Sequence, residues 1–165
     1  MKSIFLIGFM GSGKTSVSKA LANILHINVI DTDELLEKTY ETTISDIFAE
    51  KGEDVFRKYE TSILKQAPTA NTIVSTGGGI VEREENIDWL INNGSVVYLE
   101  TGWETIVTRL KEDTTRPIWN NAGRDKQKLL EERDLKYKRT ADVIVQTDGK
   151  SPDMIASEIL GVLNL

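Results

Sequence analysis

The residues Gly8-Phe9-Met10-Gly11-Ser12-Gly13-Lys14-Thr15 decide the fold of this chain. They match the pattern G-x-x-x-x-G-K-[ST], whose glycines let the backbone curl so that several N–H groups face a chain of phosphates. The apolar run at residues 3–7 directly before them predicts a buried strand, and the apolar spacing of residues 14–25 predicts a helix. Strand, loop and helix in this order predict a P-loop, with the positive end of the helix at the phosphates.

The chemistry of a P-loop assigns tasks to the residues at the start of the helix. Lys14 is expected to reach the β and γ phosphates, and the hydroxyl of Thr15 is expected to bind Mg²⁺, the expected cofactor. A glycine-rich turn with an exposed lysine is the alternative, and the agreement of strand, spacing and helix disfavours it. The residues expected to contact ATP here are Gly11, Ser12, Gly13, Lys14, Thr15 and Ser16.

Short apolar runs alternate with longer segments of helical period along the rest of the chain. This alternation is typical of βα units around a mainly parallel sheet, so we expect an α/β fold. Strands are predicted at residues 3–7, 27–30, 72–75, 96–99 and 143–145. The clearest helices are predicted at residues 14–25, 54–66, 103–111, 126–138 and 153–163. Residues 112–124 have weak periodicity, and we expect them to form a mobile lid.

The composition argues against several classes of protein. The 165 residues suggest one domain, residues 1–165, and 26 acidic against 20 basic side chains give a net charge of −6, which disfavours nucleic acid and anionic membranes as partners. The chain has no cysteine, so it has no disulfide framework or thiolate metal site, and the single His26 is expected to be structural. No apolar run is long enough for a signal peptide or a membrane span. We therefore expect a cytoplasmic protein, and we expect it to be a monomer.

Two acidic residues, Asp31 and Asp33, follow the second predicted strand. The carboxyl ends of parallel strands face the crevice where ligands bind in open α/β sheets, so both carboxylates should lie near the P-loop. The simpler alternative is that Thr32 or Asp33 only caps a helix that begins at Glu34. Beside a P-loop, the pair suggests a division of tasks. One carboxylate would steer Mg²⁺ through water, and the other would accept a hydrogen bond from an acceptor hydroxyl.

Further motifs follow the acidic pair in a specific order and spacing. They are Ile44-Ser45-Asp46-Ile47-Phe48, Lys51-Gly52-Glu53, Phe56-Arg57 with Glu60, and Ser75-Thr76-Gly77-Gly78-Gly79. With these motifs the chain resembles the shikimate kinase family from Ile4 to about Ala156. The resemblance implies a three-layer α/β sandwich with a five-stranded parallel sheet, a P-loop NTPase fold of the nucleoside monophosphate kinase type. It also implies an ATP-dependent phosphotransferase with an alcohol acceptor, which phosphorylates the 3-hydroxyl of shikimate in chorismate and aromatic amino-acid biosynthesis.

The resemblance implies roles within residues 32–60, the expected shikimate-binding segment. Asp33 matches the carboxylate that binds shikimate hydroxyls and takes or orients the reacting proton, and Asp31 matches the one near Mg²⁺. Arg57 matches a ligand of the shikimate carboxylate, with Glu60 as its structural partner. Arginine suits this task independently of the family, because its planar guanidinium offers a fork of donors to a carboxylate. Without the motif, Arg57 and Glu60 would be interpreted as a surface pair on a helix.

Roles later in the chain also come from the resemblance. Gly77, Gly78 and Gly79 match a triglycine turn whose backbone approaches shikimate and the γ-phosphate, and a plain flexible turn is the alternative. Ser75 and Thr76 stand where a P-loop enzyme often has an acid, which leaves metal binding to Thr15 and Asp31. Arg133, which precedes Tyr137 by four residues, matches the second arginine on the shikimate carboxylate. Without the motif, it would be placed on a solvated helix face.

Two further arginines are expected to contact the nucleotide. Arg116, followed by Pro117, matches the lid arginine that closes over the phosphates, whereas an exposed loop arginine is the alternative. The family often has leucine after Arg-Pro, but this chain has Ile118, which leaves the packing of the lid open. Arg109 matches an arginine that packs on the adenine, and residues 148–152 resemble the loop that encloses the adenine.

Other classes of P-loop protein fit the sequence less well. A GTP-binding switch is disfavoured because the motifs Asn-Lys-x-Asp and Asp-x-x-Gly are absent. A gluconate kinase or a nucleoside monophosphate kinase would share fold and chemistry, but neither accounts for Asp33, Arg57, the triglycine turn and Arg133 together. A nucleotide-binding module without catalysis would be expected to lack Lys14, Asp33 or Arg116, and all three are present.

Overall fold

A computed structural model of the chain describes residues 1–111 and 125–165. Its centre is a parallel sheet built from β1 (Ile4–Ile7), β2 (Asn28–Asp31), β3 (Thr72–Ser75), β4 (Ser95–Glu100) and β5 (Val143–Gln146). The strand order is β2-β3-β1-β4-β5, and every neighbouring pair is parallel. The five predicted strands are confirmed, with ends that differ by one residue at most. Because β1 is central, the P-loop that follows it lies in the middle of the carboxyl edge of the sheet.

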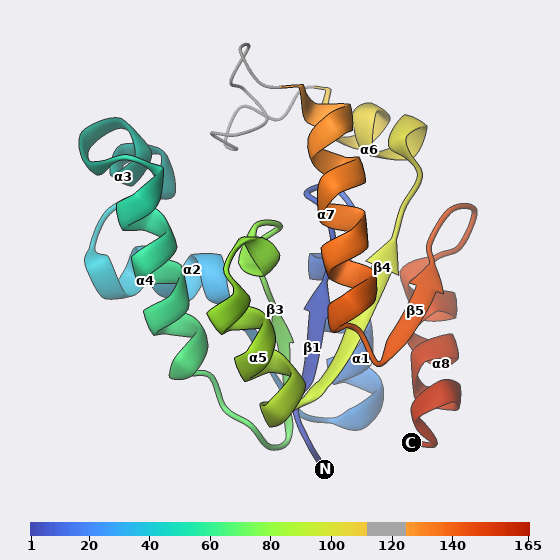
Figure 1. Cartoon of the computed structure of the whole chain (residues 1–165). Helices are drawn as coiled ribbons and strands as arrows, with labels where there is room; N and C mark the ends of the chain where they lie inside the picture. The colour runs from blue at the N-terminus through green and yellow to red at the C-terminus, as the bar shows by residue number, and fades with distance from the viewer. Residues whose placement is uncertain (112–124) are drawn as a thin grey trace.

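Helices cover both faces of this sheet (Figure 1). They are α1 (Lys14–Leu25), α2 (Thr32–Tyr40), α3 (Ile44–Lys51), α4 (Glu53–Lys65), the 3₁₀ turn η1 (Ile80–Glu82), α5 (Glu84–Asn93), α6 (Trp103–Leu110), α7 (Lys126–Thr140) and α8 (Pro152–Leu163). One face packs on α1 and α8, and the other packs on α5, α7 and the end of α4. The predicted three-layer α/β sandwich is therefore confirmed.

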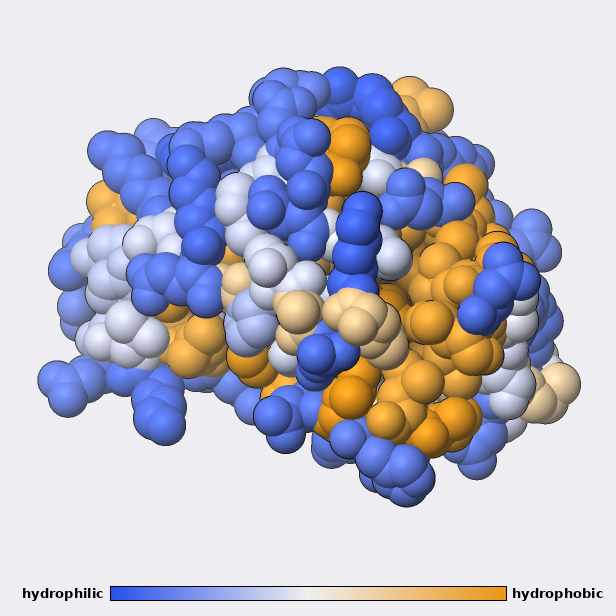
Figure 2. Space-filling model, turned by 90° about the horizontal axis from the view of Figure 1, so that it is seen from below, coloured by the Kyte–Doolittle hydropathy of each residue, from blue (hydrophilic) through white to orange (hydrophobic). Residues whose placement is uncertain are grey.

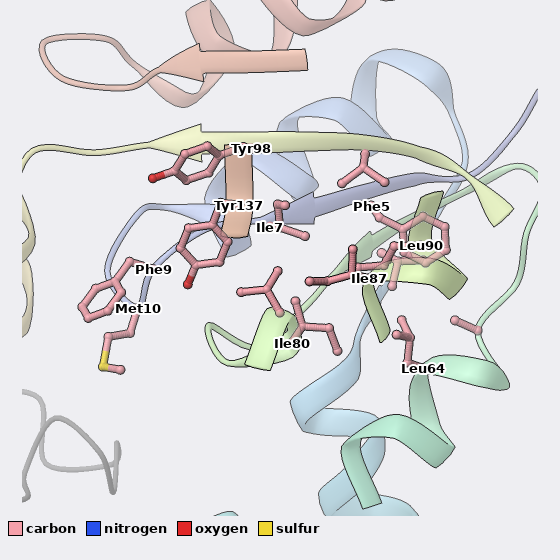
Figure 3. Packing of buried hydrophobic residues seen from close by; sticks show 14 of the residues in the cluster. Phe5, Ile7, Phe9, Met10, Leu64, Ile80, Ile87, Leu90, Tyr98 and Tyr137 are labelled. Carbon is pink, nitrogen blue, oxygen red and sulfur yellow. The ribbon is translucent and has the colours of Figure 1, made fainter. Parts of the chain in front are cut away.

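The central strand β1 shows how the sequence builds both layers. Successive side chains of a strand point to opposite faces, so Ile4 and Leu6 join the core under α1 and α8, while Phe5 and Ile7 join the other core. The ring of Phe5 meets Trp89 edge-on at 5.5 Å between centroids. Figure 3 shows Phe5, Ile87 and Leu90 together in the second core. All four residues of β1 are fully buried, as expected for an apolar strand covered on both faces.

The helices α2, α3 and α4 form a separate unit at one side of the sheet (Figure 1). They have their own apolar cluster, whose buried members are Leu36, Ile47, Phe56 and Ile63. The segment 32–60, which is expected to bind shikimate, belongs to this unit. The cluster fixes the orientation of α4 relative to α2, so that the polar side chains of both helices can face a common space.

The end of the molecule opposite the P-loop carries both chain termini (Figure 1). Figure 2 shows this end, where hydrophobic residues gather on one side and hydrophilic residues cover most of the rest. The exposed apolar side chains of the molecule include Ile24, Val162 and Leu165. Within residues 1–111 and 125–165, no helix combines the length and the apolar character that crossing a membrane requires.

The structure differs from the sequence prediction mainly in its short elements. Two helices, α3 and α5, and the turn η1 were not predicted. The helix expected to begin at Glu34 begins instead at Thr32, and its N-cap is Asp31 rather than Thr32 or Asp33. The reason is that Asp31 Oδ1 accepts hydrogen bonds from the N–H groups of Asp33 at 2.9 Å and Glu34 at 3.2 Å.

Candidate active site

The P-loop connects β1 to α1 through a backbone conformation that only glycines adopt without strain. Gly13, the N-cap of α1, has φ 91°, in the left-handed region. At Gly8 a Cβ atom would lie 2.8 Å from Ser12 Oγ and 2.9 Å from the carbonyl oxygen of Leu99, so no other residue fits without displacing the loop. The glycines of the motif are thus explained by the geometry of the turn itself.

The phosphate cavity, a space of about 280 Å³, opens at the start of α1. Lys14 lies there with its Nζ donating to the carbonyl oxygens of Gly8 at 2.7 Å and Phe9 at 3.0 Å. Arg109 on α6 donates from Nη1 to the carbonyl oxygen of Gly11 at 2.9 Å, which places its guanidinium beside the loop. The lining residues are Gly11, Gly13, Lys14, Thr15, Ser16, Asp31, Asp33, Ser75, Thr76, Gly77, Gly78, Arg109 and Leu110.

A second space, the acceptor cavity of about 340 Å³, lies between the unit α2–α4 and the triglycine turn. Its lining residues are Met10, Asp31, Asp33, Glu34, Glu37, Ile44, Phe48, Phe56, Arg57, Glu60, Gly77, Gly78, Gly79 and Arg133. The two cavities share four residues, Asp31, Asp33, Gly77 and Gly78. A ligand in one cavity can therefore meet a ligand in the other at these residues.

Arg57 on α4 is buried in the wall of the acceptor cavity, with 6% of its surface exposed. Its Nη1 donates to Glu60 at 2.9 Å and its Nη2 donates to Glu53 at 3.3 Å. Burial alone lowers the pKa of Arg57, but the charges and hydrogen bonds of Glu60 and Glu53 outweigh it and raise the pKa above its ordinary value. The interpretation of Arg57 and Glu60 as a surface pair is wrong, because the fold buries both.

Glu60 is the more deeply buried partner of this pair, with 1% of its surface exposed. Burial raises the pKa of Glu60, because the charged carboxylate loses its water, and the charge of Arg57 offsets only part of the effect. Its Oε2 has no hydrogen-bond partner within the part of the chain that the structure describes. Glu60 thus holds Arg57 at the cavity wall, although burying the Glu60 carboxylate away from water costs free energy.

Arg133 on α7 reaches the same cavity from the opposite side and is completely buried. Its Nε donates to Glu82 Oε1 at 3.4 Å, and its guanidinium lies over the ring of Phe9 with the central carbon 5.8 Å from the centroid. Among the residues described, neither Nη1 nor Nη2 has a hydrogen-bond partner. The placement of Arg133 on a solvated face is therefore wrong, because α7 turns this residue inward together with Leu129 and Tyr137.

The triglycine turn after β3 passes between these charged side chains. A Cβ atom on Gly77 would lie 2.8 Å from Asp33 Oδ1, and one on Gly79 would overlap the guanidinium of Arg57. The carbonyl oxygen of Gly78 accepts a hydrogen bond from the hydroxyl of Tyr137. The turn is therefore a close approach of backbone to the site residues, and the reading of a plain flexible turn is wrong.

The loops after β4 and β5 lie beside the P-loop on the nucleotide side. The hydroxyl of Thr101 donates to the carbonyl oxygen of Ser12 at 3.4 Å and forms a hydrogen bond with the hydroxyl of Thr147. The N–H of Gly102 donates to Asp148 at 3.0 Å. These contacts join Thr147 and Asp148, at the start of the segment that resembles an adenine loop, to the residues that follow β4 and through Thr101 to the P-loop.

The residues expected to hold Mg²⁺ lie at the phosphate cavity. Thr15 and Asp31 both line it, and Asp31 uses Oδ1 as the N-cap of α2. In the described parts of the chain no three metal-binding side chains gather at one point. This donor set fits Mg²⁺ in a nucleotide site, because that ion is commonly held by one or two carboxylates together with phosphate oxygens and water.

Some expected site residues lie outside the described residues, and some cavity residues were not expected. Arg116 and the expected lid at residues 112–124 belong to the first group. Met10, Glu34 and Glu37 belong to the second group. Glu82 was not expected either, and it contacts Arg133 without lining the cavity. Ile44, Phe48 and Phe56 belong to the motifs that carry the family resemblance, although the resemblance implies no role for them. Apolar side chains next to polar residues in the sequence could have indicated a cavity wall that faces a ligand. Nothing in the sequence, however, connects Glu82 to Arg133.

Comparisons with known proteins agree on one family. The family model described as shikimate kinase matches residues 10–164. A curated shikimate kinase of Bacillus cereus (strain AH187) is 45% identical over 164 residues, which is 99% of each chain. A solved shikimate kinase of Acinetobacter baumannii in complex with shikimate superposes with a TM-score of 0.94 at 32% identity, covering 99% of this chain and 93% of that one. The shikimate kinase of Aquifex aeolicus superposes with a TM-score of 0.86 at 36% identity, covering 98% and 96%.

Proposed function

The chain belongs to the shikimate kinase family, and we propose that it transfers the γ-phosphoryl group of ATP to the 3-hydroxyl of shikimate, giving shikimate 3-phosphate and ADP. The observation that carries this proposal is the meeting of the two cavities at Asp31, Asp33, Gly77 and Gly78. Phosphoryl transfer depends mainly on positioning and on stabilisation of charge, so a donor site and an acceptor site must share a boundary.

The acceptor cavity suits a small hydroxylated carboxylate. Arg57 and Arg133 would bind the carboxylate, because both are buried at the wall and guanidinium groups match the geometry of a carboxylate. The apolar side chains of Phe48 and Phe56 would cover the carbon skeleton. Two buried arginines disfavour a neutral sugar as the acceptor, because it offers no anionic group to them. Gluconate and AMP do carry a carboxylate and a phosphate, so the assay must compare them directly with shikimate.

Asp33 would accept a hydrogen bond from the reacting hydroxyl, because it lines both cavities and stands beside the triglycine turn. In this position the carboxylate orients the hydroxyl oxygen towards the γ-phosphorus and can receive its proton as the new P–O bond forms. The turn at Gly77 and Gly78 lets the substrate come close, because no side chain intervenes.

The phosphate side would hold MgATP. Lys14, now bonded to carbonyl oxygens of its own loop, would move its donors to the β and γ phosphates. Thr15, with Asp31 through water, would hold Mg²⁺, which when bound neutralises charge on the β and γ phosphate oxygens. Arg109 would face the adenine, and Arg116 would approach the phosphates from residues 112–124, the proposed lid.

A coupled assay tests the function directly. With MgATP and purified protein, ADP should be released when shikimate is added, and shikimate 3-phosphate should be identified by mass spectrometry. Gluconate and AMP serve as alternative acceptors of P-loop kinases with the same fold. Equal turnover of either one would contradict the proposal.

We also propose that the enzyme acts in the cytoplasm as a monomer that comprises one domain, residues 1–165. Support for a single domain comes from the fold, in which one five-stranded sheet carries both cavities at its carboxyl edge. The net charge of −6 gives no support for nucleic acid as a partner. Light scattering at assay concentration should give the mass of a single chain, and a larger mass would contradict the proposed state.

A further inference from the structure

Glu82 stands at the junction of the triglycine turn and α7, although nothing assigns it a function. Its carboxylate accepts from Nε of the fully buried Arg133 at 3.4 Å and from Lys136 Nζ at 3.3 Å. The side chain of Glu82 is 22% exposed and does not line the acceptor cavity, whereas Arg133 does. The carboxylate is thus placed to act on a ligand only through Arg133.

The backbone that carries Glu82 is held firmly. Glu82 ends the turn η1, and its N–H donates to the carbonyl oxygen of Gly79 at 3.0 Å. The two preceding residues, Ile80 and Val81, are buried in the core. The side chain of the buried Asn86 donates to the carbonyl oxygen of Ile80 at 3.0 Å. The backbone of Glu82 therefore has a fixed position relative to Gly79, and the ion pairs with Arg133 and Lys136 hold its carboxylate.

The geometry of the guanidinium shows what this fixed carboxylate achieves. Arg133 offers Nε to Glu82 and lies over the ring of Phe9, while Nη1 and Nη2 form no hydrogen bond of good geometry with a described residue. The guanidinium also lies close enough to the hydroxyl of Tyr137 to oppose the rise that burial causes in the pKa of that residue. A guanidinium binds a carboxylate through two parallel N–H donors on one edge. Because Glu82 occupies Nε, the edge formed by Nη1 and Nη2 is left to a ligand in the acceptor cavity.

We propose that Glu82 is a positioning residue, which holds Nε of Arg133 so that the two terminal nitrogens present a fork to the carboxylate of the acceptor. This inference rests on the proposed function, in which the acceptor is a carboxylate. It adds a determinant of acceptor affinity that lies outside the cavity wall. Burial acts to raise the pKa of Glu82, but Arg133 and Lys136 outweigh it and lower the pKa, so the carboxylate stays ionised at neutral pH.

Charge alone would make Glu82 unfavourable for binding an anion. By Coulomb's law, removing a negative charge near Arg133 should strengthen the attraction for a carboxylate ligand. Positioning has the opposite consequence, because a guanidinium without an anchor must lose rotational freedom when the ligand binds. The sign of the change in shikimate affinity therefore separates the two accounts.

The test uses the full-length chain with Glu82→Gln and Glu82→Ala. We expect Glu82→Ala to raise the Kd for shikimate, measured by calorimetry, and its KM about tenfold, as for loss of a hydrogen bond to a charged group. Glu82→Gln should raise both less, about threefold, because its amide oxygen still accepts from Nε. The KM for ATP should change by less than about twofold in both variants, because Glu82 does not line the phosphate cavity. Should Glu82→Ala fail to fold, Glu82→Gln alone decides, because it keeps the shape of the side chain.

Glu84→Gln is the matched control. Glu84 and Arg139 form an exposed ion pair with N–O distances of 2.7 and 2.9 Å, and the pair joins α5 to α7 close to Glu82. If Glu82 only holds α7 in place, the Glu82 variants and Glu84→Gln should all have a lower melting temperature, and the KM for shikimate should be unchanged in all of them. That result, or tighter binding of shikimate by either Glu82 variant, overturns the proposal.

A second background tests whether Glu82 acts through Arg133. Arg133→Lys keeps the charge but removes the fork, so adding Glu82→Gln to it should cost no further affinity for shikimate. An equal loss in both backgrounds overturns the proposal. The calorimetric Kd does not depend on turnover. A wild-type chain that binds shikimate without phosphorylating it would therefore contradict the proposed function. The Kd values of the variants would still decide the role of Glu82.

Discussion

The phosphate cavity and the acceptor cavity meet at four residues, yet they are built in different ways. On the phosphate side, the P-loop and the start of α1 contribute one contiguous stretch within residues 11–16, which is joined by residues at the ends of β2, β3 and α6. The acceptor side consists of side chains from α2, α3, α4 and α7 with the turn after β3, brought together by the fold. Its arginines are buried and depend on buried or half-buried acids for their positions. The first site is thus set by local backbone conformation and the second by the burial of charge.

The largest effect that separates the two sides is expected from Lys14→Ala. Lys14 should stabilise charge on the transferred phosphoryl group, so its loss should lower kcat by about 10²–10³, as for other single donors to a transition state. The melting temperature should change little, because Lys14 is half-exposed. Steady-state kinetics and circular dichroism measure both quantities. Lys19→Ala, an exposed lysine on the same helix, is the control, and near-normal turnover of Lys14→Ala would remove this lysine from the mechanism.

On the acceptor side, Arg57→Ala should act mainly on binding. We expect shikimate to bind more weakly by about 1.5–3 kcal/mol, the range for a hydrogen bond to a charged group. The variant also leaves Glu60 buried without its partner, which lowers stability by itself. Arg57→Ala combined with Glu60→Gln removes that penalty, so the loss of affinity in the double variant reports on the ligand. An unchanged apparent affinity there would refute the role of Arg57, and Arg139→Ala, on the surface, serves as the control.

A smaller effect, on stability as well as binding, is expected from Gly79→Ala. The added Cβ would overlap the guanidinium of Arg57, which Glu60 and Glu53 hold in place. Overpacking of this kind costs about 1–3 kcal/mol of stability. Urea denaturation measures the free energy of unfolding. Gly161→Ala in α8 is the matched control, because a Cβ there meets no atom within 4 Å, and equal stability changes in the two variants would argue against a fixed guanidinium.

The smallest effect concerns pH. Because the pKa of Glu60 is raised by burial, the folded state keeps a proton that the unfolded chain has already lost above the ordinary glutamate pKa. The free energy of unfolding should therefore fall as pH rises from that ordinary value to the raised pKa, by at most about 1.4 kcal/mol per pH unit from this one group. Glu60→Gln should remove this fall in urea unfolding measured between about pH 4 and 8.

Glu82 should show the opposite sign in the same measurement. Its pKa is lowered in the folded state, so its stabilising contribution is present above the ordinary glutamate pKa and is lost as pH falls through the lowered one. Glu82→Gln should accordingly flatten the acidic side of the profile. Parallel changes in the two variants would show that the environments of the two carboxylates are not distinct.

The strands and long helices could be predicted from the sequence, because their apolar spacing reports directly on burial. The short helices could not. α3 has only Ile47 fully buried and α5 is rich in charge, so tertiary packing rather than a strong local pattern holds them. Two local signals were nevertheless present. Thr43 caps α3 through Asp46 N, and the spacing of Ile87 and Leu90 fits one face of α5.

The site residues also differ in how much of their placement could be predicted from the sequence. Of the residues at 11–16 that are expected to contact ATP, all except Ser12 line the phosphate cavity. The residues Asp31, Asp33, Arg57, Gly77, Gly78, Gly79 and Arg133 gather at the two adjoining cavities. The resemblance to a family selected these residues, but it did not indicate that Arg57 and Arg133 would be buried. Arg133 stands among Glu131, Glu132 and Asp134 in the sequence, and only the docking of α7 on the sheet shows which of them faces inward.

The sequence by itself determined the phosphate loop, the parallel sheet and the types of residue available for catalysis. A P-loop is contiguous in the sequence, and its conformation follows from the glycines within it. The residues 8–15 are therefore sufficient to predict it. Tertiary structure was needed to show which acid holds Arg133, whereas the pair of Arg57 and Glu60 is already indicated by its i,i+3 spacing on one helix. Glu82 and Arg133 lie 51 positions apart, and their pairing depends on a 3₁₀ turn and a helix packed against one core. Because that pairing depends on how the helix and the turn pack together, no local pattern in the sequence predicts it.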